Sequence, residues 1–395
     1  MVTTMNSAAR STTGHARPLR SARKRTCSIL AWPFVAALGA APAHATAPSD
    51  LCTGNPCVVS GAVTVDPGSS LDFGATTDLR FAPNAVVSTS GVAFTARSIV
   101  LEGGARIVAA DYSEISLTST DGNVELQNGV AGPSRIELSH LGPGSVEIDA
   151  YPAGNVVLDG IVDASAGAPY LSPGDVSVFA VGTISGGGQL RSSSGPGSSG
   201  GYVHLYGSTA VTTSASVDVS SPVSGGFYVI EVDTGDASVS GNIDIRGGDD
   251  SGGYVQITTY QGSVTLGGSI LGTGTTGNGV FTCSGDSHIE IESAGAVTLS
   301  ATAELNGIGE SCQTGGLSVQ AATTVTQLPG SKIAAIGLSR NYGGLIQIDA
   351  GGDVVLRNLD VGSGDTGGEV DVSSGGAVQI LGPVEVGGDA GAANI

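Results

Sequence analysis

The segment IDIRGGDD brings together an arginine and three carboxylates that suit proton transfer or cation binding. Asp244 and Arg246 alternate with apolar residues, so on a strand both point to the same side, and Asp249 and Asp250 follow on the next corner. Lyase chemistry on an acidic polysaccharide needs carboxylates that hold calcium and a base that removes a proton. Arginine acts as such a base only when its pKa is strongly depressed. The alternative is a solvated corner with an ion pair worth under about 1 kcal/mol.

Tyrosines that recur at similar positions form a second candidate site. Tyr202 and Tyr254 each follow a Gly-Gly pair, in SGGYVHL and SGGYVQI. The aromatic residues that cluster with them in three consecutive units are Tyr206, Phe227, Tyr228 and Tyr260. Tyrosine rings pack on the faces of sugars, so a surface that binds ligands is predicted to use these residues. Aromatic ladders also stabilise sheets without any ligand, and this interpretation is favoured.

Other residues with catalytic potential lack the surroundings that their chemistry requires. GTGTTG at 272–277 is not followed by the helix of a dinucleotide site, and Ser199 in GSSGG opens a repeat unit where a nucleophile elbow needs a helix. No pair among His140, His204 and His288 has metal-ligand spacing, and the last two are expected at outward positions on neighbouring faces. We expect no cofactor. Adventitious calcium binding at the single glycine–aspartate phrases RGGDDSGGYVQ and VGSGDTGGEVD is the alternative.

The N-terminal segment differs in composition from the rest of the chain. Residues 1–25 contain five arginines, one lysine and no acid, and an apolar run at 27–38 precedes Ala43-His44-Ala45. This order is typical of a secretory signal peptide, and we expect cleavage after Ala45. The apolar run is too short to span a bilayer, and we expect no transmembrane segment in the mature chain. Export through this signal peptide is therefore predicted.

The charge balance excludes two classes of partner. Beyond residue 45 the chain has nine basic residues against 35 acids, a net charge of −26, whereas the whole chain carries −20. A polyanion lacks the basic surface that nucleic acids require, and an anionic membrane surface repels it.

Four cysteines remain in this exported part, an even number that favours disulfides over free thiols. Cys52 and Cys57 lie in CTGNPC, a tight loop that closes on itself. Cys283 and Cys312 fall at nearly the same corner of neighbouring repeat units, where one strand spacing suits the Cα separation of a disulfide. We predict both disulfides.

A repeated pattern of small residues, glycines and alternating apolar residues must position all these side chains. Units begin at residues 199, 224, 251, 284, 314, 342 and 366, which are 24 to 33 residues apart. Each unit contains three short phrases of period two, as in Val370/Val372, Val378/Ile380 and Val384/Val386. Such strands bury a core only by stacking, which predicts an all-β parallel β-solenoid with three strands per coil, roughly a dozen coils and little or no helix after the signal peptide.

The same pattern divides the chain into segments. Residues 46–110 lack the Gly-Gly register and are predicted to form an N-terminal cap and the first coils. Residues 111–395 are predicted to form the repeats. The final GGDAGAANI begins another unit and stops within its first strand, so we expect the chain to be a fragment of a longer protein.

The GG-x-V-x-I phrases at 252–257, 343–348 and 367–372 resemble the β-solenoid surface proteins typified by filamentous haemagglutinin and autotransporter passengers. The resemblance implies a right-handed parallel β-helix, export to the surface of a Gram-negative-type bacterium, and glycans or a host or neighbouring cell as partners. It also implies an outer-membrane secretion partner. FAPNAV at 81–86 lacks the N-P-N-G motif of that family, and no C-terminal membrane barrel is present in this sequence.

The sequence therefore predicts a secreted cell-surface β-solenoid with a structural or adhesive role and no catalysis. The alternative is a calcium-dependent polysaccharide lyase or another carbohydrate-active β-helix enzyme.

Overall fold

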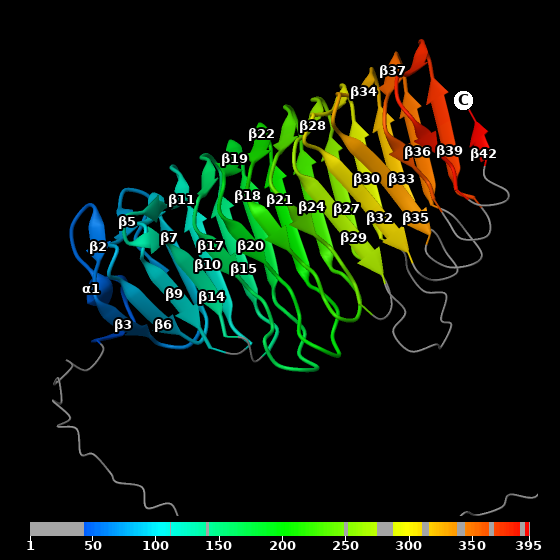
Figure 1. Ribbon diagram of the computed structural model, residues 1–395. Coiled ribbons are helices and arrows are strands. Elements are labelled where there is room, and N and C mark those ends of the chain that lie inside the picture. Colours follow the sequence, from blue (N-terminus) through cyan, green and yellow to red (C-terminus); the bar gives the residue numbers. More distant parts are fainter. Residues whose placement is uncertain are drawn as a thin grey trace, which may run out of the picture. The chain divides into compact units, whose positions relative to one another are not determined.

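The computed structural model describes residues 43–110, 112–139, 142–248, 252–274, 287–309, 316–337, 344–362, 367–387 and 392–394 (Figure 1). Over these ranges the chain forms a right-handed parallel β-solenoid of about 11 turns with three parallel sheets. The fold class that the repeats and the resemblance predict is confirmed.

The three sheets are called C, B and A, in the order in which each turn of the chain adds a strand to them. In one turn, for example, β24 belongs to sheet C, β25 to sheet B and β26 to sheet A. Within the described part of the chain, sheet C has 13 strands: β4 (Ser69–Asp72), β7 (Val92–Ala96), β10 (Glu114–Ser119), β15 (Ser145–Ala150), β18 (Asp175–Ala180), β21 (Tyr202–Gly207), β24 (Phe227–Val232), β27 (Tyr254–Thr259), β30 (His288–Ser293), β33 (Gly316–Ala321), β36 (Leu345–Ala350), β39 (Glu369–Ser374) and β42 (Ala392–Asn394).

Sheet B follows sheet C along the chain. Its strands, 13 among the described residues, are β2 (Cys57–Val59), β5 (Asp78–Phe81), β8 (Ser98–Leu101), β11 (Val124–Leu126), β16 (Val156–Leu158), β19 (Thr183–Gly186), β22 (Ala210–Thr213), β25 (Ala237–Val239), β28 (Val264–Leu266), β31 (Val297–Leu299), β34 (Val325–Gln327), β37 (Val354–Leu356) and β40 (Val378–Ile380).

Sheet A completes each turn. Its strands, 14 where the chain is described, are β1 (Ala43–Ala45), β3 (Ala62–Val65), β6 (Val86–Thr89), β9 (Arg106–Ala109), β14 (Arg135–Leu138), β17 (Ile161–Asp163), β20 (Gln189–Arg191), β23 (Ser216–Asp218), β26 (Ile243–Asp244), β29 (Ser269–Gly274), β32 (Glu304–Gly309), β35 (Lys332–Gly337), β38 (Leu359–Asp360) and β41 (Val384–Glu385).

Alternation along each strand separates the core from the outer faces. In β21 the burial alternates between half-buried and buried, so that Val203 and Leu205 point inward and Tyr202, His204 and Tyr206 point outward. Inward residues of successive coils stack in register, since Val176 pairs with Val203 and Val178 pairs with Leu205. Burying such aliphatic side chains contributes about 1.5–3 kcal/mol each, and stacking lets every coil share this gain with its neighbours.

The Gly-Gly pairs before β24 and β27 have a steric cause. A Cβ atom on Gly226 would lie 2.1 Å from the carbonyl oxygen of Gly201 in the preceding coil, and one on Gly253 would lie 2.2 Å from that of Gly226. Successive coils therefore approach too closely at this corner for a side chain. The phrase that reveals the repeat in the sequence is thus required by the stacking.

Two local elements interrupt the coils. The described helix α1 (Pro48–Leu51) precedes β2, and β12 (Asn128–Gly129) pairs antiparallel with β13 (Gly132–Pro133) in a hairpin between β11 and β14. No helix in the described ranges has the length and apolar character needed to cross a membrane.

The first predicted disulfide is present, and the second lies outside the described residues. The structure joins Cys52 to Cys57, whose Cα atoms are 5.3 Å apart. Cys57 begins β2 and is 2 % exposed, so the bond ties the α1 segment to sheet B. Cys283 and Cys312 both fall in undescribed ranges.

We expect Cys52→Ser to weaken the N-terminal coil locally. Opening so short a loop costs about 2 kcal/mol of stability in the chain-entropy model. Hydrogen exchange should quicken in α1 and β2 and stay unchanged in β21, which lies several coils away. Unchanged exchange in β2 would show that the disulfide does not stabilise this end.

Candidate functional site

The outer face of sheet C is acidic over its described strands. Its described strands contain no lysine or arginine, whereas sheets A and B carry Arg80, Arg106, Arg135, Arg191 and Lys332. The carboxylates on its outward positions are Asp72, Glu114, Glu147, Asp149, Asp175, Glu231, Glu290, Glu292, Asp349, Glu369 and Asp371. Among the described strands, the excess of acidic over basic residues is therefore largest on the outer face of sheet C.

An aromatic column crosses this face at the first position of four neighbouring strands. Tyr202 pairs with Phe227, Phe227 with Tyr254, and Tyr254 with His288. The ring centroids of Phe227 and Tyr254 are 6.0 Å apart, and Tyr254 stacks on His288 at 5.5 Å with an interplanar angle of 4°. The sequence prediction that Tyr202 and Tyr254 share one repeat position is confirmed.

Tyr228 departs from the prediction that it belongs to the binding surface. The side chain is 0 % exposed and pairs with Val203 and Val255, both inward residues. The cause is register, because in SGGFYVI the residue after the glycines is Phe227, which takes the outward position and is 51 % exposed. Phe227 therefore replaces Tyr228 as the surface residue of this coil.

A second aromatic group lies at the fifth position of the strands. Phe179 pairs with Tyr206, and their ring centroids are 6.0 Å apart. His204, two residues from Tyr206, meets the ring of Phe179 edge-on at 5.5 Å. The expectation that His204 and His288 lie on neighbouring faces is wrong, because β21 and β30 both belong to sheet C.

Hydrogen bonds to carboxylates fix these rings. The Tyr206 hydroxyl donates to Asp233 and the Tyr254 hydroxyl donates to Glu290. The bond to Asp233 raises the pKa of Tyr206, and burial followed by Glu290 raises the pKa of Tyr254. Both phenols therefore remain protonated donors at neutral pH, and the rings form a pre-ordered platform.

Two grooves run beside the strand ends of this face. The Asp149 groove has a volume of about 280 Å³ and is lined by Glu147, Asp149, Tyr151, Phe179, Ala180, Val181 and Tyr206. The Asp349 groove has a volume of about 500 Å³ and is lined by Thr258, Thr259, Tyr260, Glu292, Ser293, Ala294, Gln320, Ala321, Ala322, Asp349, Ala350, Gly351 and Ser373.

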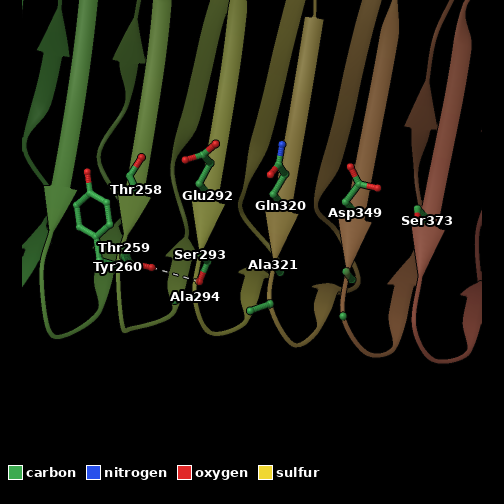
Figure 2. A pocket seen from close by; sticks show the side chains of 13 residues that line it. Thr258, Thr259, Tyr260, Glu292, Ser293, Ala294, Gln320, Ala321, Asp349 and Ser373 are labelled. Carbon is green, nitrogen blue, oxygen red and sulfur yellow. Dashed lines mark hydrogen bonds between the residues drawn. The ribbon is translucent and has the colours of Figure 1, made fainter.

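The polar side chains of the Asp349 groove repeat once per coil. Thr258, Glu292, Gln320, Asp349 and Ser373 occupy the same register position on β27, β30, β33, β36 and β39. Figure 2 shows them projecting in a row to the same side, with the ring of Tyr260 at one end. The groove thus presents a line of hydrogen-bonding groups along the direction in which the coils stack.

Glu231 and Asp233 connect the two grooves. The hydroxyl of Tyr206, in the Asp149 groove, donates a hydrogen bond to Asp233. The hydroxyl of Tyr260, in the Asp349 groove, donates one to Oε1 of Glu231 at 3.4 Å. The register continues from Tyr206 to Glu231 to Thr258, so both grooves follow the same position of sheet C. Glu231 also lies 3.0 Å from Nε2 of His204.

Asp149 is held in an unfavourable environment for a carboxylate. Burial is the main cause that raises its pKa, and the neighbouring Glu147 raises it further. Its Oδ1 atom is buried and has no hydrogen-bond partner in the structure. Such an acceptor costs stability unless a donor from outside the chain satisfies it.

Replacing Asp149 with asparagine should stabilise the protein at pH 7. An acid whose pKa is raised by folding destabilises the native state when it is ionised, a penalty that is absent below the unfolded pKa of about 3.9 and grows as the pH rises. We expect the free energy of unfolding to rise by about 0.5 kcal/mol at pH 7 and to match the parent at pH 3. Urea denaturation at both pH values measures this difference.

The control is Asp371→Asn, which changes an exposed carboxylate on β39 and should have no such pH-dependent gain. A loss of stability in Asp149→Asn at pH 7 would show that the carboxylate is satisfied in the native protein.

Of the residues in the lyase interpretation, Asp244 ends β26 of sheet A and Arg246 follows two residues later, so neither belongs to sheet C with its aromatic residues. The Arg246 guanidinium donates to both carboxylate oxygens of Asp244, with Nε 2.9 Å from Oδ1. This contact raises the pKa of Arg246, which keeps it a cation and unsuited to act as a base. Asp249 and Asp250 lie outside the described residues, and over the described ranges no group of three or more His, Cys, Asp or Glu residues could hold a metal ion.

Ser199 lies in a loop that leads into strand β21 and not into a helix, so the strand–turn–helix geometry of a nucleophile elbow is absent there. Of GTGTTG, Gly272 to Gly274 belong to β29, and the rest of the motif falls outside the described residues.

Sequence reasoning missed Phe179 and the groove carboxylates. Glu292, Gln320 and Asp349 are separated by 28 and 29 residues, yet each is the fifth residue of its sheet C strand. Counting five positions from the start of each strand would have found this line of side chains.

Comparisons with protein-family models, with curated proteins and with solved structures find no match for this chain. The resemblance to filamentous haemagglutinin and autotransporter passengers therefore rests on the Gly-Gly phrases of the sequence, and the structure shows a β-solenoid of about 11 turns. The molecule is a parallel β-solenoid with an acidic, aromatic outer face on sheet C.

Proposed function

We propose that the chain is an adhesive rod, exported to the cell surface, that contacts glycans through the outer face of sheet C without catalysis. The observation that supports this proposal is the segregation of side chains among the three sheets. Sheet C combines outward aromatic rings with carboxylates and has no lysine or arginine in its described strands.

A purely structural role does not require this segregation. The outer face of a solenoid sheet needs only polar residues of β propensity, and sheets A and B meet this need with mixed charges. Phe227 and Tyr260 are 51 % and 56 % exposed. About half of their surface therefore stays in water and contributes no free energy of burial to the fold. Aromatic platforms with neighbouring hydrogen-bonding groups suit the apolar faces and hydroxyls of sugars.

The surface location rests on the sequence. The basic and apolar N-terminal segment with its Ala43-His44-Ala45 site and the Gly-Gly phrases both favour export of the bacterial surface-protein type. An outer-membrane secretion partner belongs to the same hypothesis.

Polysaccharide binding by the immobilised full-length chain tests the proposal. Neutral, amino-bearing and acidic polysaccharides are passed over it, and both the retained polysaccharide and any released fragments are measured. We expect retention of a polysaccharide without fragments, and a loss of about tenfold or more in the variant Tyr202→Ser/Phe227→Ser/Tyr254→Ser.

The matched control is Tyr112→Ser/Tyr170→Ser, which removes two tyrosines that are 71 % and 81 % exposed in loops outside the sheets. The control should bind like the parent. Equal binding by both variants, or no binding to any polysaccharide, would contradict the glycan-contact proposal, and released fragments would contradict the absence of catalysis.

A further inference from the structure

Among the described residues, no lysine or arginine pairs with a carboxylate that lines either groove. Every ion pair that the structure shows between Lys or Arg and an acid within the described ranges lies off the strands of sheet C, as Arg97–Asp78 and Arg246–Asp244 do. The linings of both grooves contain no lysine or arginine. A ligand that enters these grooves therefore meets an uncompensated negative field.

We propose, on the basis of the glycan-contact function above, that this face binds a glycan that carries free amino groups, and that the chain of sugars lies along the line of stacked coils. The ammonium groups contact the carboxylates of the two grooves, from Asp149 to Asp349, and the sugar rings pack on the aromatic side chains that line these grooves, Phe179, Tyr206 and Tyr260. Uronic or sulfated glycans are repelled by the same field.

The spacing of the groove suits a linear glycan. Neighbouring strands lie about 4.8 Å apart, so the line Thr258, Glu292, Gln320, Asp349 offers one polar side chain per step of this length. One pyranose unit of an extended β-linked glycan advances by a comparable length. Each sugar can then meet the same kind of contact on successive coils, and weak contacts add along the chain.

Asp149 supplies an independent indication of an ammonium donor. Its buried Oδ1 atom has no partner in the structure although it belongs to the lining of a groove. A charged donor satisfies such an acceptor with a charge-assisted hydrogen bond and stabilises the ionised form that burial disfavours.

A glycan fits this face better than a basic peptide. Peptides that bind sheets gain affinity by pairing with an exposed strand edge, whereas β21, β24, β27 and β30 are paired on both sides. The groups that remain are upright rings and carboxylates, which match the faces and amines of sugars.

Isothermal titration of the full-length chain with three ligands tests the inference. The ligands are a hexamer of β-1,4-linked glucosamine, the same hexamer with every amine acetylated, and hexalysine. We expect the free-amine hexamer to bind at least about tenfold more tightly than either other ligand, with an affinity that falls as salt is added.

Variants locate the contacts. Asp149→Asn/Glu292→Gln/Asp349→Asn should lose about tenfold or more in affinity for the free-amine hexamer. The control Asp218→Asn/Glu304→Gln/Asp360→Asn makes the same change in charge on sheet A and should keep the parent affinity.

The outcomes separate the two proposals. Equal or tighter binding of the acetylated hexamer overturns the amino-sugar inference and leaves the glycan-contact function standing. Tighter binding of hexalysine, or equal losses in both variants, overturns the inference as well. Failure of both hexamers to bind, together with the polysaccharide panel, overturns both proposals.

Discussion

Gly154→Ala should lower the free energy of unfolding by about 4 kcal/mol, whereas Gly68→Ala should lower it by about 1 kcal/mol. Both glycines have positive φ, +128° at Gly154 and +70° at Gly68. A Cβ atom on Gly154 would lie 1.8 Å from the carbonyl oxygen of Gly122 in the preceding coil, while one on Gly68 meets nothing within 4 Å. The first variant must therefore push two coils apart, and the second suffers only backbone strain.

Urea denaturation followed by circular dichroism measures both changes. Because coils of a solenoid can unfold in parts, hydrogen exchange near Gly122 provides a local reading of the same effect. Similar losses in the two variants would mean that close stacking of the turns does not limit this corner.

Phe94→Ala and Phe227→Ala should separate the core from the outer face of the same sheet. Phe94 on β7 is 0 % exposed and meets Phe81 edge-on with ring centroids 5.4 Å apart. Removing its ring leaves a cavity and should cost about 4 kcal/mol. Phe227 on β24 is 51 % exposed, so its removal should cost under about 1 kcal/mol.

Only one of the two phenylalanine variants should lose affinity for the ligand. Phe227→Ala should reduce polysaccharide binding although the protein remains folded, and Phe94→Ala should bind normally at temperatures where it is still folded. Thermal and urea denaturation alongside a binding assay give both readings. Normal binding by Phe227→Ala would remove this residue from the contact surface.

Much of the fold follows from period and spacing. Pairs such as Val370/Val372 and Val378/Ile380 alternate with polar residues, and the structure places all four in strands of sheets C and B. The Gly-Gly phrases identify where several sheet C strands begin, because at Gly226 and Gly253 the close approach of the preceding coil leaves no room for a Cβ atom. Local patterning therefore predicts the solenoid without knowledge of any contact.

The coils at residues 43–109 are less visible in the sequence. They contribute β1 to β9 to the same three sheets, but their corners use other residues, so the Gly-Gly register cannot find them. At Gly91, for example, a Cβ atom would lie 3.6 Å from the nearest atom, which is an ordinary contact, and the glycine reflects a φ of +99° alone.

The candidate site required information from more than one coil. Tyr202 and Tyr254 could be matched by their place after the glycines, but whether Tyr228 or Phe227 faces outward depends on a shift of one residue. The absence of lysine and arginine from the described strands of sheet C appears only when each strand is assigned to its sheet. The grooves arise from the path of the turns, which the strand pattern does not determine.

A comparison of two variants with equal net charge tests the role of sheet C most directly. One carries Glu231→Gln/Glu290→Gln/Glu292→Gln/Asp349→Asn on sheet C, and the other carries Asp218→Asn/Glu304→Gln/Asp360→Asn/Glu385→Gln on sheet A. The measured quantity is the dissociation constant of the full-length chain for an amino-bearing polysaccharide at fixed salt. We expect a loss of about tenfold or more in affinity for the sheet C variant and none for the sheet A variant. Equal affinities in the two variants would contradict the assignment of the binding face to sheet C.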